Sequence, residues 1–198
     1  MTSENHKIRS MKISEQLLRE FEPQSTWLAH DSYYHGIGHM SRVLILQELI
    51  SNLLEQNGAM VNRTALRWAA AAHDVGRVDD GLDLEHGTRS AEWIKRNLAD
   101  RMTPEELDIA TYIVHWHTPS DHLAPDMTIE LQILKDADAL DRVRLGDLDP
   151  TYLRTDVAKN LVDTAQQLYD ASRPQDLNQK ETFEDVISAA AKLGIVTK

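Results

Sequence analysis

Histidine and aspartate side chains gather in a few short stretches of the sequence. Eight of the nine histidines lie between residues 30 and 122. They recur with aspartates in "YYHGIGH" (33–39), "HD" (73–74), "EHG" (85–87), "HWH" (115–117) and "KDADALD" (135–141). Imidazole and carboxylate groups together suit divalent cations such as Mn, Fe, Co, Ni, Zn or Mg. This pattern indicates a metal centre rather than histidines scattered over a surface.

The pair His73 and Asp74 directly follows four consecutive alanines at 69–72. A helix this apolar is expected to pack into a core, where a carboxylate needs a strong partner. A metal ion bound at the end of the helix supplies that partner. Because the sequence has no cysteine, an open catalytic site is favoured over a closed structural zinc site. Gly76 is expected to permit a chain reversal just after the pair.

These residues must be positioned by helices, which the sequence predicts throughout. Runs that alternate between apolar and polar residues over the length of a strand are missing, whereas helix start and stop signals recur. Thr103 and Glu106 predict a capping box around Pro104, Asn62 is a good N-cap, and Gly58 is suited to follow a helix. We expect helices around 10–21, 39–56, from 62 through the alanines, from 87 to about 99, from 103, over 128–144, near 156–172 and from 182 to 194.

The length of 198 residues is expected to form a single domain with one core. The net charge of −11 argues against stable binding to nucleic acid or to an anionic membrane, but it permits a nucleotide substrate.

An apolar signal core and an apolar run of the ~20 residues needed to span a membrane are both missing, so a cytoplasmic protein is expected. Residues 1–8 and 172–181 are expected to be a loose end and a linker. Whether the chain forms a homodimer is left open.

The motifs "YHGIGH", "HDVGR", "EHGTRSAEW" and "DADALD", in this order, resemble those of the HD-domain superfamily of metal-dependent phosphohydrolases. The resemblance covers about residues 30–145. It implies an all-α, compact helical HD-domain fold, extended by extra C-terminal helices in about 146–198. It also implies that His39, His73, Asp74 and Asp138 bind a first metal ion and that Asp74 reaches a second. Asp141, one helical turn beyond Asp138, is expected to be dispensable for metal binding.

Family members with two metal ions carry two additional histidines, one after the HD pair and one before the final aspartate. His86 matches the first position, whereas His115 and His117 compete for the second. If this segment is helical, His117 lies on an apolar face and His115 on a more polar one, which favours His117. The same comparison does not separate Asp136 from Asp138, and only the motif favours Asp138.

The resemblance implies catalysis by two divalent ions that hold a hydroxide, since a metal ion lowers the pKa of bound water. Asp74 is the central residue of this centre. In the phosphodiesterase branch of the superfamily, a histidine with the spacing of His35 to His39 protonates the leaving group; a loop histidine bonded to the backbone is the alternative. Arg77 stands where related proteins often carry a basic residue near the phosphate, and an ordinary surface arginine is the alternative there.

The implied activity is hydrolysis of a small phosphorylated metabolite, such as a nucleotide or dinucleotide. Small bacterial HD proteins that cleave dinucleoside polyphosphates also carry "HG…SA" and "HT", as in "EHGTRSAEW" and "WHT" here. Hydrolases of guanosine tetraphosphate typically carry a Glu-Asp pair shortly after HD, which "HDVGRVDD" lacks. A di-iron oxygenase and a non-catalytic metal-binding regulatory module are the two alternative functions.

Overall fold

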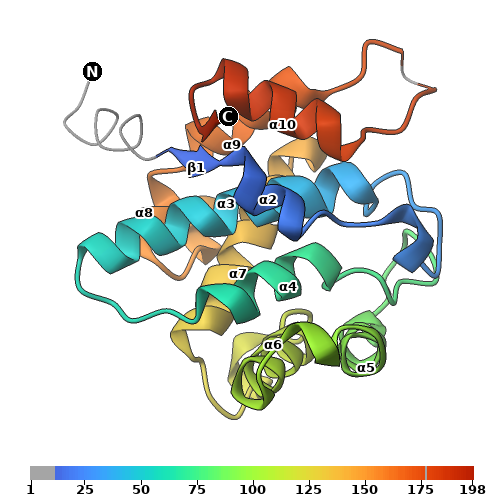
Figure 1. The fold of residues 1–198 in the computed structure, drawn as a ribbon, viewed down its shortest axis with the longest axis vertical. Helices are drawn as coiled ribbons and strands as arrows, with labels where there is room; N and C mark the ends of the chain where they lie inside the picture. The colour runs from blue at the N-terminus through green and yellow to red at the C-terminus, as the bar shows by residue number, and fades with distance from the viewer. Residues whose placement is uncertain (1–11, 177) are drawn as a thin grey trace.

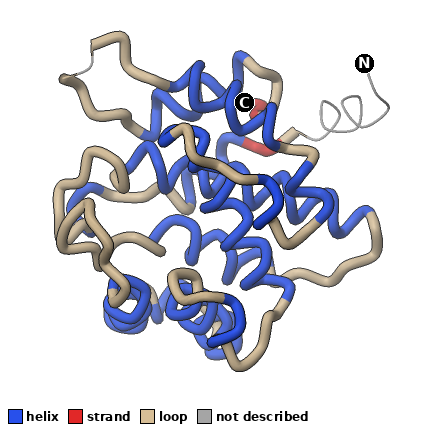
Figure 2. Tube along the Cα trace, turned by 180° about the vertical axis from the view of Figure 1, so that it is seen from behind, coloured by secondary structure: helices blue, strands red, loops and turns tan. Residues whose placement is uncertain are grey.

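Helices make up nearly all of the regular structure in the computed structural model, which describes residues 12–176 and 178–198 (Figures 1 and 2). The α-helices are α2 (Glu15–Glu20), α3 (Ile37–Gln56), α4 (Arg63–Ala72), α5 (His86–Asn97), α6 (Pro104–Trp116), α7 (Ile129–Leu140), α8 (Asp156–Lys159), α9 (Val162–Ser172) and α10 (Phe183–Lys192). Short 3₁₀ helices cover Ser25–Trp27, Ala99–Arg101, Asp121–Leu123, Asp141–Leu145 and Pro150–Tyr152. The predicted all-α fold is confirmed.

The helix ends follow the capping residues that the sequence contains. The Asn62 side chain accepts a hydrogen bond from the amide of Ala65 at the start of α4. Thr103 and Glu106 form the predicted capping box of α6, and Thr182 forms another with Asp185 at the start of α10. Side-chain oxygens at these positions satisfy amide groups that would otherwise lack partners in the first helical turn.

Three helices differ from their predicted extents. The first begins at residue 15 rather than 10, because β1 (Ile13–Ser14) forms a short parallel pair with β2 (Val196–Thr197); residues 10 and 11, like the predicted loose end at 1–8, lie outside the described part. The α-helix predicted over 128–144 ends at Leu140 and continues as a 3₁₀ turn. The helix predicted near 156–172 is divided into α8 and α9 by a turn at which Leu161 is fully buried.

Helix α3 crosses the middle of the molecule and is the centre of its core (Figure 1). It packs against α4, α7, α9 and α10, and every residue from 38 to 51 is buried. A helix enclosed on all sides is expected to be apolar all round, yet this one carries His39, Arg42 and Glu48 in the interior. Each of these side chains therefore requires a specific partner.

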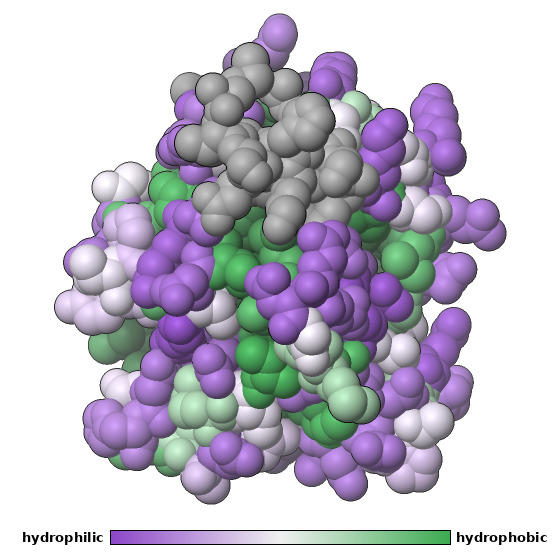
Figure 3. Space-filling view, turned by 90° about the vertical axis from the view of Figure 1, so that its left-hand side faces the viewer, coloured by the Kyte–Doolittle hydropathy of each residue, from purple (hydrophilic) through white to green (hydrophobic). Residues whose placement is uncertain are grey.

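The surface of the molecule and the lengths of its helices are consistent with the composition of the chain, in which 27% of the residues are charged and 41% are hydrophobic. On the face shown in Figure 3, hydrophilic side chains predominate, and apolar side chains gather in a band across the middle. Among the helices of the described residues, none combines the length and the apolar character needed to span a bilayer.

Candidate metal centre

Histidine and aspartate side chains from five helices converge at one end of the bundle. Each is located at or near a helix end. The residues are His39 in the first turn of α3, His73 and Asp74 at the end of α4, His86 at the start of α5, His117 at the end of α6 and Asp138 in the last turn of α7.

A first group of ligand atoms consists of His39, His73 and Asp138. The two imidazole Nε2 atoms lie 3.1 Å apart, and Asp138 Oδ1 lies 3.4 Å from the Nε2 of His39 and 4.0 Å from that of His73. Asp74 Oδ2 lies 3.4 and 3.8 Å from the same two nitrogens. Four candidate ligand atoms thus surround one small volume.

A second group consists of Asp74, His86 and His117. Asp74 Oδ1 lies 3.0 Å from His86 Nε2 and 3.7 Å from His117 Nε2, and these two nitrogens are 3.0 Å apart. The two oxygens of the single Asp74 carboxylate therefore face different groups of histidines. This is the arrangement required of a carboxylate that bridges two cations.

The other ring nitrogen of each histidine shows which nitrogen is free to bind a cation. In all four rings Nδ1 faces an oxygen atom: Asp141 Oδ2 for His39 (2.7 Å), the carbonyl of Ala70 for His73 (2.9 Å), the carbonyl of Val114 for His117 (2.6 Å) and the carbonyl of Asp83 for His86. A carbonyl oxygen can only accept, so these rings donate from Nδ1 and direct the Nε2 lone pair into the site. Two lone pairs about 3 Å apart repel one another unless a proton or a metal ion lies between them. The donor set therefore fits a cation.

The electrostatics of the first group also favour positive charge. Burial lowers the pKa of His73 to about 4, so this ring is neutral at pH 7 and can bind a metal ion. Burial and a nearby arginine lower the pKa of His39, but hydrogen bonds with three aspartates outweigh them and raise it to about 9. A proton on His39 and a divalent ion are thus alternative sources of the positive charge that these carboxylates stabilise.

The carboxylates show the opposite response to the same surroundings. Burial by itself raises the pKa of Asp74, but His73 and hydrogen bonds with further histidines hold it well below its usual range. The Asp138 side chain is 34% exposed; partial burial opposes its ionisation, and its interaction with His39 lowers its pKa. One buried and one partly buried ionised carboxylate, side by side, favour the binding of cations.

The structure places the two members of each pair of alternative ligands in different surroundings. His117 points into the second group, whereas the ring of His115 packs against Trp116, with centroids 4.7 Å apart. Asp138 belongs to the first group. Asp136 instead accepts hydrogen bonds from the amides of Arg154 and Thr155, each at 2.8 Å. It thereby holds the segment between the 3₁₀ helix Pro150–Tyr152 and α8.

Asp141, expected to be dispensable for metal binding, directly contacts a candidate metal ligand. Its carboxylate is fully buried and accepts the Nδ1–H of His39 at 2.7 Å and the Nε–H of Arg42 at 2.5 Å. This carboxylate orients the His39 ring and selects its tautomer, as partners of metal-binding histidines generally do. In the sequence, the one signal is that Arg42 follows His39 by three residues and directly precedes the apolar run Val43–Leu46.

The chain turns at residues 73–76 as expected, and the Arg77 amide donates to the Asp74 carbonyl at 3.1 Å, but Gly76 is needed there for close packing. It does not adopt a left-handed conformation; instead, a Cβ atom here would lie 2.6 Å from the amide nitrogen of Ser90 and 2.8 Å from Cβ of Arg89. The Gly76 amide donates to Ser90 Oγ at 2.9 Å, and its carbonyl accepts from Arg89 Nε at 2.8 Å. The glycine thus permits close contact between the end of α4 and α5, which brings His86 to Asp74.

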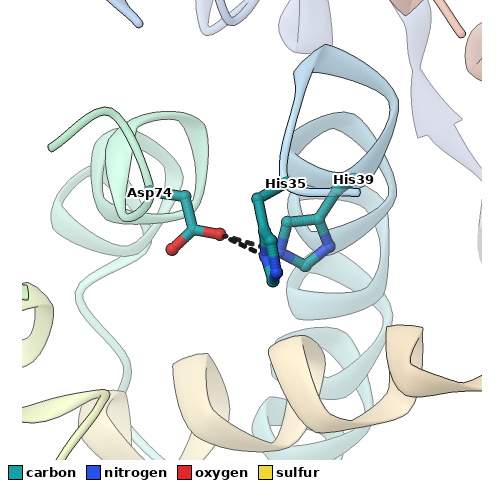
Figure 4. Close-up of side chains that lie close together, drawn as sticks. All are labelled: His35, His39 and Asp74. Carbon is teal, nitrogen blue, oxygen red and sulfur yellow. Dashed lines mark hydrogen bonds and ion pairs between the residues drawn. The ribbon is translucent and has the colours of Figure 1, made fainter. Parts of the chain in front are cut away.

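The two residues expected to act on a substrate lie beside Asp74. His35 Nδ1 is 3.0 Å from Asp74 Oδ2, and the close-up in Figure 4 shows His35 and His39 on the same side of that carboxylate. Arg77 Nε is 3.4 Å from the same oxygen. Arg144, which the sequence analysis missed, donates to the carbonyl of Tyr34 at 3.1 Å, and its Nη2 lies 3.4 Å from His35 Nδ1. Its spacing from the histidine motifs contained no signal for this role.

Variants of the histidines at the ends of α5 and α6 test the second group. His86→Ala and His117→Ala are each expected to lose one of two metal equivalents and to keep the fold, because His39, His73 and Asp138 remain in place. Elemental analysis with circular dichroism measures both. His115→Ala is the matched control and is expected to retain two equivalents. Loss of metal from His115→Ala, or full content in His117→Ala, would contradict the assignment.

Comparison with known proteins identifies the fold. The chain matches the HD domain family over residues 36–143, which is more than half of its length and includes all six residues of the two groups. No curated protein and no solved structure gives a significant match. The segment from 144 onwards, with α8, α9 and α10, lies beyond the matched region. On the extent of this match, the chain belongs to the HD-domain superfamily.

Proposed function

We propose that the protein is a metal-dependent phosphohydrolase acting on a small phosphorylated metabolite, namely a nucleotide or dinucleotide. The observation that carries this proposal is the convergence of four Nε2 atoms on the two oxygens of Asp74. HD-domain proteins are generally metal-dependent phosphohydrolases, and a centre of this composition suits that chemistry.

Two divalent ions are the proposed cofactors. His39, His73, Asp74 and Asp138 would hold the first, and Asp74, His86 and His117 the second. Nitrogen and oxygen donors without thiolates suit Mn, Fe, Co, Ni, Zn or Mg. When bound, such ions supply Lewis acidity toward a phosphoryl oxygen and lower the pKa of water toward neutrality.

The side chains around the centre would bind and orient the phosphate. Arg144 Nη2 lies 3.4 Å from His35 Nδ1, and Arg77 Nε lies 3.4 Å from the Asp74 oxygen that His35 contacts. Guanidinium groups match the geometry of phosphate oxygens. His35 is 16% exposed and shares a hydrogen bond with Asp74. This position suits transfer of a proton to the oxygen of a leaving group. The assignment of His35, Arg77 and Asp74 as catalytic residues remains part of the proposal.

A cleft beside His39 supports a substrate with a sizeable organic part. Its volume is about 420 Å³, and its lining combines tyrosines with both basic and acidic side chains, among them Arg144, Arg173, Asp31 and Asp176. Tyr33 and Tyr34 lie on the loop that leads to His35, are 52% and 54% exposed, and have ring centroids 6.1 Å apart. Aromatic rings at such a position can stack on a nucleobase. The net charge of −11 disfavours long polyanions such as RNA or DNA.

A substrate screen with metal-loaded protein tests the proposal. Nucleotides, dinucleoside polyphosphates, sugar phosphates and phosphonates would be incubated with the Mn, Co and Fe forms, both in air and without oxygen. We expect phosphate or nucleotide release that is independent of oxygen and strongest for nucleotides or dinucleotides. Oxygen-dependent turnover of a phosphonate, without hydrolysis of any ester, would place the protein among the di-iron oxygenases. Full metal content without turnover of any substrate would favour a regulatory module.

Arg77→Ala separates substrate binding from metal binding. It is expected to lower the hydrolytic rate by about a hundredfold, the typical loss when one preorganised electrostatic donor is removed, and to leave metal content unchanged. Steady-state kinetics and elemental analysis measure the two effects. Arg96→Ala, at an exposed position on α5, is the control and should leave both unchanged. If Arg77→Ala reduced metal content in proportion to its rate, the proposed contact with phosphate would be wrong.

A further inference from the structure

The loop between α9 and α10 reaches a buried arginine in the HD domain. Glu181, the residue before the N-cap of α10, forms an ion pair with Nη1 of Arg42. Glu181 lies outside the region that matches the HD family, whereas Arg42 lies within it. The contact therefore joins the C-terminal extension to helix α3, one turn beyond His39.

Arg42 is 2% exposed, and its hydrogen-bonding groups are divided between two carboxylates. Nε and Nη2 donate to the two oxygens of Asp141 at 2.5 and 3.1 Å, whereas Nη1 faces Glu181 and, at 3.5 Å, Ser172 Oγ. The guanidinium carbon also lies 5.2 Å from the centre of the Tyr169 ring. A buried guanidinium that loses one carboxylate must move or attract water, because an unpaired buried charge is costly.

Movement of Arg42 would be transmitted to the candidate metal centre. The Asp141 oxygen that accepts from Arg42 Nη2 is also the oxygen that accepts from His39 Nδ1, at 2.7 Å. Asp141 is fully buried and has its pKa lowered to about 2, since Arg42 and His39 overcome the effect of burial. The position of this single oxygen sets both the rotation of the His39 ring and the direction of its Nε2 lone pair.

We propose that Glu181 and Arg42 are positioning residues of the metal centre, which act on His39 through Asp141. The C-terminal extension would thereby contribute to metal affinity, although its described residues include none of the candidate ligands. This inference rests on the metal centre proposed above. Partners that orient a metal-binding histidine typically contribute about 10- to 100-fold to metal affinity.

Gly38 provides a second way to disturb the same contact. A Cβ atom at this position would overlap the Glu181 side chain, whose own Cβ lies 2.7 Å away. An alanine at Gly38 must therefore displace Glu181 from Arg42 without altering any charged group. Because both changes act on one contact, their effects on metal affinity should not be additive.

Titration of the full-length protein with Co²⁺ tests the proposal. The measured quantities are the two dissociation constants, the visible absorption of bound Co²⁺ and the melting temperature of the metal-free protein. Glu181→Ala is expected to weaken the first site by about tenfold and to change its absorption, and Glu181→Gln should have a smaller effect because an amide still accepts a hydrogen bond. Gly38→Ala should weaken Co²⁺ binding to the same extent as Glu181→Ala. The double variant should bind Co²⁺ no more weakly than Glu181→Ala alone.

Glu184→Ala is the matched control, because it removes an ion pair with Arg19 from the same end of α10. It is expected to leave both dissociation constants and the absorption unchanged, whatever its effect on stability. Wild-type Co²⁺ affinities and absorption in Glu181→Ala would overturn the inference, as would an equal loss in Glu184→Ala. Failure of the wild-type protein to bind Co²⁺ would instead contradict the proposed metal centre, and the inference with it.

Discussion

Replacement of Asp74 by alanine is expected to empty both proposed metal sites and to abolish hydrolysis. Asp74 Oδ2 faces His39 and His73, and Asp74 Oδ1 faces His86 and His117, so a single substitution removes an oxygen ligand from each group. A metal ion supplies several kcal/mol of transition-state stabilisation, and its loss should lower the rate by more than about a thousandfold. Elemental analysis and steady-state kinetics on the same preparation measure both effects.

Asp108→Ala is a suitable control, because Asp108 lies at an exposed position on α6. This variant should keep two metal equivalents and the wild-type rate. Asp74→Asn provides a further comparison, since the amide preserves the size of the side chain but removes its charge. Two full equivalents of metal in Asp74→Ala would show that this carboxylate does not bridge two ions.

Chelation of the wild-type protein is expected to remove both its activity and part of its stability. Four buried imidazoles and two carboxylates would then lose the two cations proposed to bind between them. If free metal is present at 100 times the dissociation constant, its binding stabilises the fold by about 2.7 kcal/mol. For a chain of this size, that corresponds to a fall of about 5–10 °C in Tm on chelation. Differential scanning calorimetry and a phosphate-release assay measure the two losses.

Readdition of Mn²⁺, Co²⁺ or Fe²⁺ should restore both properties, and a chelator already saturated with metal should change neither. The order in which the ions restore activity would also indicate which metal ion supports the proposed activity. Full activity in protein that elemental analysis shows to be free of metal would contradict the proposed mechanism.

Local sequence patterns predicted the helices and most of the converging residues. Asn62, Thr103 and Thr182 start helices at the predicted positions because a cap is a contact between residues three apart. His117 was preferred to His115 because helical periodicity places them on different faces, and the structure brings only His117 to Asp74. Their roles as ligands remain predictions that the metal analyses above must test.

Other features could be decided only by contacts between distant parts of the chain. Asp136 and Asp138 are two residues apart on a helix with apolar neighbours on both faces, and only packing shows that Asp136 meets Thr155 while Asp138 meets His39. Likewise, the sequence indicated only that Gly76 permits a turn, whereas its role in packing depends on how closely α5 approaches the end of α4.

Most of the helices, the family resemblance and the candidate histidines and aspartates could be predicted from the chain alone, because caps, helical periodicity and each short motif depend on residues close together in the sequence. Only tertiary packing shows which carboxylate supports which imidazole. Asp141 and His39 are separated by 102 residues and Glu181 and Arg42 by 139, and such distances leave no local pattern. A buried charge takes the partner that packing brings to it, and the helices must assemble before that partner is defined.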